Sequence, residues 1–152
     1  MKKLVVLDQI CDRITDNSVI RRIILEEFAY QSKNKSSLIA LQAVEGIKNC
    51  GLEKNRIADT SKSMFYPSIK ALIKIVKINK DDRVLGRCIQ NLHQMLLKDK
   101  QKTTEVVYYL VSMLDKIKSP SAKARIIKLI IDFKDYFKTL ARETFRKLAK
   151  GF

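Results

Sequence analysis

Apolar side chains almost encircle the helix that the sequence predicts near its C-terminal end, and this constrains the fold. Ser119 and Pro120 are typical of a helix start: serine caps backbone N–H groups, and proline lacks only an N–H that would be left unbonded there. From Ile126 to Phe133 most positions are apolar, so neighbouring helices must cover this helix on more than one flank. A second, amphipathic helix is predicted over residues 139–150 and stopped by Gly151. One such pair cannot bury its own apolar surface, so we expect further pairs.

The rest of the chain predicts three more pairs of helices. The four pairs cover approximately residues 3–32, 36–78, 81–117 and 119–150. Their starts are about 40 residues apart, the length of HEAT and armadillo repeats. We therefore expect residues 1–152 to form a single all-α domain. Its predicted architecture is an α-solenoid of HEAT/armadillo-like helix pairs, with about four pairs and about eight helices. A compact bundle of about eight helices is the alternative that the same periodicity allows.

Helical spacing also predicts which side chains face the core. The expected inward residues of the second and third helices are Ile20, Ile23, Ile24, Phe28, Leu38, Leu41, Val44 and Ile47. Arg21 is expected to face mainly outward. Gly51 is expected to end the third helix in the left-handed conformation. Gly46 and Gly86 stand inside helices, where they would allow neighbouring helices to approach closely.

The chain is strongly basic, with a formal net charge of +15. Such a charge suits an anionic partner, which could be nucleic acid, an acidic membrane surface or an acidic protein, whereas a lysine-rich solvated surface is the alternative that needs no partner. The candidate contacts to an anionic surface share one helix face or flank it, and are Lys62, Lys70, Lys74, Lys77 and Lys80. No aromatic residues interleave with these lysines to stack bases, which weakens the nucleic-acid hypothesis.

The sequence offers no catalytic, cofactor-binding or metal-binding constellation, so we expect a non-enzymatic protein without a cofactor. The single histidine, His93, lies on an amphipathic helix, and no glycine-rich phosphate loop is present. Cys11, Cys50 and Cys88 are far apart and lie among apolar residues. They are expected to be buried free thiols in a reducing compartment. The sequence shows no signal peptide and no membrane-spanning segment, which favours a cytoplasmic location.

Several short segments, in order along the chain, carry a family pattern. One of them, A-x-A-x-I-I-x-L-I-x-(D/E)-(F/Y) at residues 122–133, resembles the trunk of β-type adaptins, the large subunits of heterotetrameric vesicle-coat adaptor complexes. RKLAKGF, at residues 146–152, resembles R-K-M-A-K-S-F in the β subunit of the third adaptor complex. KLVVLDQI, LEEFAYQSKN and ALQAVEGIKNC resemble further trunk segments, at residues 3–10, 25–34 and 40–50. The family usually has Trp at Lys128 and Gly at Ile131, so helix packing there is expected to differ.

This resemblance implies a scaffold or adaptor subunit in intracellular vesicle-mediated protein transport. It covers only a middle section of the trunk and implies contacts with other adaptor-complex subunits. It also implies a cytoplasmic location, peripheral to Golgi or endosomal membranes. The alternative is a basic helical-repeat module that binds nucleic acid or an anionic membrane. Because LVVL at residues 4–7 and Phe152 are apolar, we also expect self-association through exposed solenoid ends.

Overall fold

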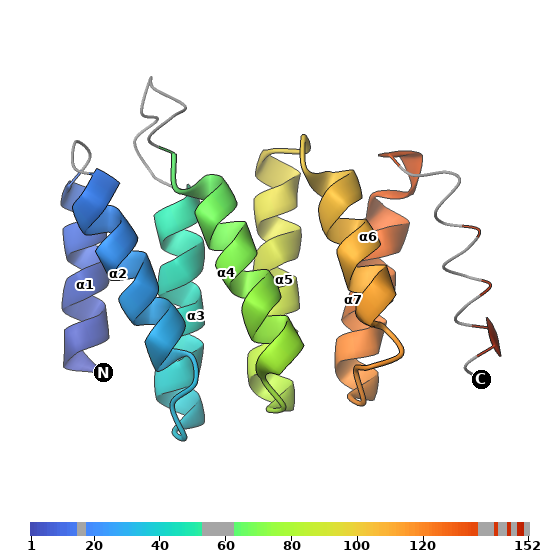
Figure 1. The fold of residues 1–152 in the computed structure, drawn as a ribbon, viewed down its shortest axis with the longest axis horizontal. Helices are drawn as coiled ribbons and strands as arrows, with labels where there is room; N and C mark the ends of the chain where they lie inside the picture. The colour runs from blue at the N-terminus through green and yellow to red at the C-terminus, as the bar shows by residue number, and fades with distance from the viewer. Residues whose placement is uncertain (15–17, 53–62, 137–141, 143–145, 147–148, 151–152) are drawn as a thin grey trace. The chain divides into compact units, whose positions relative to one another are not determined.

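The described part of the chain contains only helices, turns and connecting segments. The structure is a computed structural model that describes residues 1–14, 18–52 and 63–136, with isolated positions at 142, 146, 149 and 150. These residues form seven α-helices and a short 3-10 helix, without a strand (Figure 1). The all-α class predicted from the sequence is confirmed. The chain divides into two units, residues 1–95 and 96–152, and each is described by itself.

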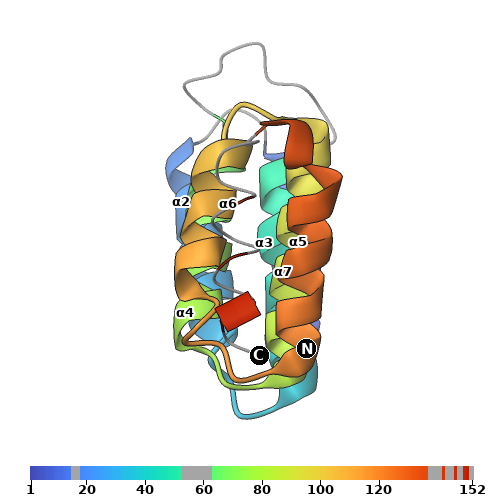
Figure 2. The same ribbon diagram turned by 90° about the vertical axis from the view of Figure 1, so that its right-hand side faces the viewer.

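The first unit stacks its helices in two layers. The helices are α1 (Lys2–Arg13), α2 (Ser18–Gln31), α3 (Ser37–Leu52), α4 (Phe65–Ile78) and α5 (Asp82–Lys98), whose last residues belong to the second unit. Helices α1, α3 and α5 form one layer, and α2 and α4 form the other (Figures 1 and 2). This alternation of helices between two stacked layers is the α-solenoid arrangement that the sequence predicts.

Polar contacts in this unit join positions about one repeat apart. The pairs are Cys11–Cys50, Asp8–Asn49, Glu45–Arg87, Ser37–Asp81, Ser32–Asn79 and Val44–Asn91. Their separations run from 39 residues for the cysteines to 47 residues for the two asparagine bonds to carbonyls. These separations agree with a repeat of about 40 residues. The boundaries of the four pairs and the single domain stay predictions.

Phe28 of α2 packs directly over a glycine of α3. The Phe28 side chain is fully buried, and a Cβ placed on Gly46 would lie 2.5 Å from its ring. Ala40 and Ala43 on α3 are also buried, so this helix presents small side chains to its neighbours. The prediction that Gly46 allows a close approach between helices is confirmed.

The rotation of α2 about its axis differs from the sequence prediction. Ile20 and Ile23 are 38% and 59% exposed, whereas Arg21 is only 2% exposed. The buried positions are 21, 24, 25 and 28. This set and the predicted set fit helical spacing equally well, so spacing alone does not choose between them. Leu38 of α3 is likewise exposed rather than inward. The side of α2 that carries Arg21 faces the Cys11 thiol of α1, which places Arg21 inside and leaves Ile20 and Ile23 exposed.

Gly51 does not end α3 as a left-handed residue. The helix continues to Leu52, and no described glycine has a positive φ. A Cβ at Gly51 would lie 2.8 Å from Ser68 Cβ and would also collide with the Met95 side chain. The glycine is therefore required for packing of α3 against α4 and α5.

The second unit contains α6 (Thr103–Met113), α7 (Pro120–Asp132) and the short 3-10 helix η2 (Lys134–Tyr136). The predicted start of α7 is confirmed, because Ser119 Oγ accepts a hydrogen bond from the Ala122 N–H at 3.1 Å and Pro120 is the first helical residue. Lys128 and Ile131, the two departures from the adaptin pattern, are exposed. The helix predicted over 139–150 and the stop at Gly151 lie outside the described residues, apart from isolated positions.

The cysteines are buried and unbridged, as the sequence predicts. Cys11 and Cys50 bring α1 and α3 together, with their sulfurs 3.0 Å apart. Their hydrogen bond lowers the pKa of Cys11, aided by the positive charge of Arg21, and raises the pKa of Cys50. Burial raises the pKa of Cys88.

Replacement of Gly46 by alanine is expected to destabilise the first unit. The new methyl group would meet the Phe28 ring, and overpacking of this kind costs about 1–3 kcal/mol. Urea denaturation followed by circular dichroism would measure the loss. The double variant Phe28→Leu/Gly46→Ala is the control, and we expect it to lose less than the sum of the single variants. Strict additivity would contradict the proposed contact.

Mild oxidation is expected to join Cys11 to Cys50. Diamide would accept the two electrons and two protons released when the sulfurs bond, and peptide mapping by mass spectrometry would identify the link. Closing a loop between residues 39 apart should raise the free energy of unfolding by up to about 4 kcal/mol. Cys88→Ser should leave the link intact and Cys50→Ser should abolish it. A link that involves Cys88 in the folded protein would contradict the packing of α1 on α3.

Candidate binding groove

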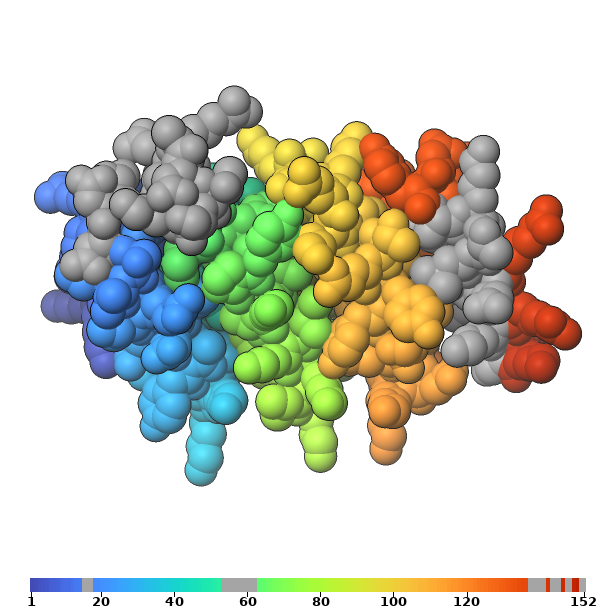
Figure 3. Space-filling model, turned by 45° about the horizontal axis from the view of Figure 1, so that its top comes forward, coloured from blue at the N-terminus to red at the C-terminus, as the bar shows by residue number. Residues whose placement is uncertain are grey.

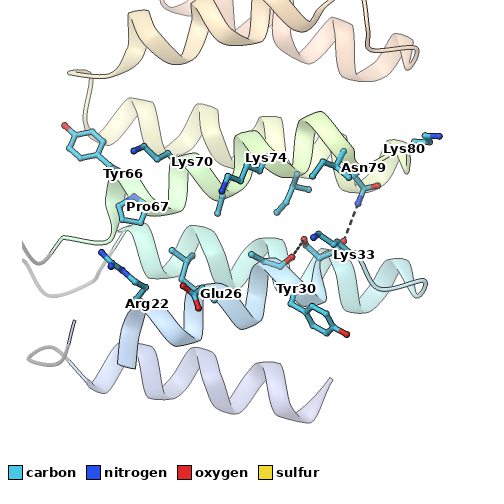
Figure 4. A pocket seen from close by; sticks show the side chains of 16 residues that line it. Arg22, Glu26, Tyr30, Lys33, Tyr66, Pro67, Lys70, Lys74, Asn79 and Lys80 are labelled. Atoms are coloured by element: carbon cyan, nitrogen blue, oxygen red, sulfur yellow. Dashed lines mark hydrogen bonds between the residues drawn. The ribbon is translucent and has the colours of Figure 1, made fainter. Parts of the chain in front are cut away.

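The first unit has a groove of about 850 Å³ between α2 and α4. Both helices run in the same direction, and they lie side by side on the face shown in Figure 3. One wall comes from residues 22–33 and the other from residues 66–80 (Figure 4). On each helix the lining residues recur at three- or four-residue spacing, so one helix face supplies each wall. We refer to this feature as the α2–α4 groove.

The lower surface of the α2–α4 groove is apolar. It includes the buried Leu25 and Ile75 and the half-buried Ala29, Pro67 and Ala71. Alanine leaves space that a longer side chain on either helix would fill. The groove can therefore receive apolar side chains of a ligand, and their transfer from water would stabilise the complex.

The rim of the α2–α4 groove is basic. Five exposed cations line it, against one carboxylate, Glu26; the cations are Arg22, Lys33, Lys70, Lys74 and Lys80. In the part of the chain that the structure describes, none of the five forms an ion pair. Their charges are therefore available to an anionic ligand, and each exposed pair would contribute about 0.2–1 kcal/mol.

Hydrogen bonds hold the two walls together at one end. Asn79 Nδ2 donates to the Ser32 carbonyl oxygen at 3.3 Å, which ties the end of α2 to the end of α4 (Figure 4). Asn79 Oδ1 also accepts from the Asp81 N–H at 2.8 Å and so fixes the turn into α5. Asp81 lies in that turn, and its Oδ2 accepts a hydrogen bond from the Ser37 hydroxyl of α3 at 2.6 Å. This bond and the one from the Arg83 N–H lower the pKa of the Asp81 carboxyl.

Three of the five lysines predicted to contact an anionic surface meet at this groove. Lys70, Lys74 and Lys80 line it, whereas Lys77 is exposed on α4 outside the lining. Lys62 lies outside the described residues. Sequence reasoning missed Arg22 and Lys33, because nothing in the local pattern of α2 shows which helix lies beside it. The repeat length was the available signal, since it places α2 one repeat before α4.

Two tyrosines line the groove together with the lysines. They are Tyr30 on α2 and Tyr66 on α4. The Tyr30 ring points away from the groove in Figure 4 and is 69% exposed. Tyr66 lies at one end, beside Pro67 (Figure 4). The two rings do not form a row along the lysines, which is the arrangement that base stacking uses.

The described residues contain no other recognisable chemical site. They include no group of three or more His, Cys, Asp or Glu residues that could hold a metal ion. His93 is half-buried on α5. Within the same residues, no helix combines the length and the apolar character that crossing a membrane requires.

Comparison with known proteins finds distant relatives among adaptor subunits. Over 129 residues, 85% of the chain, it is 23% identical to AP-3 complex subunit beta-2 of Mus musculus. It is also 23% identical over the same length to AP-3 complex subunit beta-1 of Canis lupus familiaris and of Homo sapiens. The chain spans 11% of the length of each of these proteins. No family model matches the chain, and no solved structure does. The similarity supports a distant adaptin-like relationship.

Loss of the Asn79 side chain is expected to destabilise the closed end of the groove. Asn79→Ala removes the donor to the Ser32 carbonyl oxygen and the acceptor of the Asp81 N–H. It should lower the free energy of unfolding by about 1–2 kcal/mol, as measured by urea denaturation. Asn34→Ala is the matched control, because Asn34 caps the equivalent turn before α3 through the Ser36 N–H but bonds only to nearby residues. Equal losses in both variants would contradict a role for Asn79 between the helices.

Proposed function

We propose that the chain is a non-enzymatic scaffold or adaptor subunit in intracellular vesicle-mediated protein transport. It acts through protein–protein contacts within an adaptor coat complex of the AP-3 type. The observation that carries this proposal is the similarity to AP-3 β subunits over 85% of the chain. The proposed partners are other subunits of such a complex, and the proposed location is cytoplasmic, at the periphery of Golgi or endosomal membranes.

The fold supports a role in binding. Stacked helix pairs expose a long surface made of many helix faces, on which partners can be held without any chemical step. The first unit also exposes apolar side chains on α1, with Val5 and Val6 43% and 51% exposed. Contact with a neighbouring subunit or with a second copy of the chain would remove this surface from water.

The second candidate function is binding of nucleic acid or an anionic membrane by the basic surface. The net charge of +15 and the five cations around the α2–α4 groove favour it. Binding of this kind weakens steeply as salt rises, because each neutralised phosphate releases counterions. The two functions therefore differ in the partners recovered and in their sensitivity to salt.

Affinity purification of the tagged full chain, followed by mass spectrometry, tests the proposed function. We expect adaptor-complex subunits in stoichiometric amounts, retained at moderate salt and after nuclease treatment. An unrelated basic helical protein of the same net charge is the control for charge alone. Recovery dominated by RNA-associated proteins that nuclease releases would contradict the proposal.

A further inference from the structure

We propose that the α2–α4 groove binds an extended acidic segment of a partner protein, in which apolar side chains alternate with carboxylates. This inference rests on the proposed scaffolding function, since a scaffold acts through the proteins that it holds. The length of the groove, its apolar lower surface and its basic rim all fit such a segment.

The length of the groove suits a short extended peptide. Its α2 wall runs from Arg22 to Lys33, and α4 lies parallel to it. At about 1.5 Å per helical residue this wall is about 16 Å long, which an extended segment of about five residues would span. Successive side chains of an extended segment point to opposite sides. Every second side chain can therefore enter the groove, while the others point out of it, where the long side chains of the rim cations can extend to them.

The apolar lower surface favours a peptide over the other anionic ligands. Leu25, Ala71 and Ile75 would contact hydrophobic side chains of the ligand. A nucleic acid backbone offers phosphate and sugar but no such side chains, and the tyrosines of the groove do not form a stacking row. A membrane surface would meet the lysine rim without filling the concave space beneath it.

The charges select an acidic segment. Lys70 and Lys74 lie one helical turn apart on one wall, and Arg22 stands at the same end as Tyr66 and Pro67 (Figure 4). Lys33 and Lys80 lie toward the opposite end, near Asn79 (Figure 4). Cations at both ends and along one wall complement carboxylates spaced along a ligand, whereas a basic segment would be repelled.

Binding can be measured with the purified full chain and fluorescence anisotropy. The probe is a fluorescein-labelled peptide of about eight residues in which aspartate alternates with leucine. Two further peptides, aspartate with serine and lysine with leucine, separate the contribution of the apolar surface from that of the rim. We expect the aspartate–leucine peptide to bind at least about tenfold more tightly than either of the others.

Two single substitutions three residues apart on α4 provide the matched test. Lys74→Glu reverses a charge on the rim, and should weaken binding of the aspartate–leucine peptide about fivefold or more. Lys77→Glu makes the same change of net charge outside the groove, and should alter affinity less than about twofold. Ala71→Leu fills the lower surface and should also weaken binding. Circular dichroism of each variant checks that its helices are retained.

Several results would overturn the inference. Equal weakening by Lys74→Glu and Lys77→Glu would show that only the overall charge matters. Tighter binding to single-stranded RNA, or to vesicles that contain phosphatidylserine, with Ala71→Leu having no effect, would assign the basic surface to those ligands. Because the assay uses the chain alone, failure here would leave recovery of adaptor subunits unaffected. Conversely, peptide binding without recovery of adaptor subunits would contradict only the proposed coat function.

Discussion

The contact between Phe28 and Gly46 determines how the first unit is built. The ring is fully buried and occupies the space in which a residue other than glycine at position 46 would place its Cβ. This contact sets both the distance of α2 from α3 and the rotation of α2. With that rotation Arg21 lies inside, near the Cys11 thiol, and Arg22, Leu25 and Ala29 face the groove. The groove surface on one side of α2 thus depends on a packing requirement on the other side.

The sequence predicts the elements well where apolar spacing and capping chemistry agree. Ser119 and Pro120 start α7 as expected, and Phe28, Val44 and Ile47 are buried as expected. Prediction fails where the deciding partner is far away in the chain. Gly51 has the sequence pattern of a helix stop, but in the structure Ser68 and Met95 pack against it. Arg21 has the sequence pattern of a surface residue, but its side chain is buried. The groove escaped prediction for the same reason, because its two walls come from different helix pairs.

The structure shows where part of the positive charge of the chain lies. Two lysines of α4 border a concave apolar surface, so they are more than a solvated helix face. Cations from α2 and from the turn after α4 border the same surface. Ions of one sign around an apolar groove are typical of recognition of amphipathic segments, since burial supplies affinity and charge supplies specificity. That combination is compatible with the distant similarity to adaptor subunits and with the proposed scaffolding function.

Nuclear magnetic resonance of the isotopically labelled 17.6 kDa chain tests the central claim most directly, because it locates the ligand. On titration with the aspartate–leucine peptide, the account predicts that amide shifts concentrate in residues 22–33 and 66–80. Amides of α1, and those around Cys88 in α5, should change little. Shifts spread over all lysine-bearing faces, or centred outside the two walls of the groove, would contradict the account.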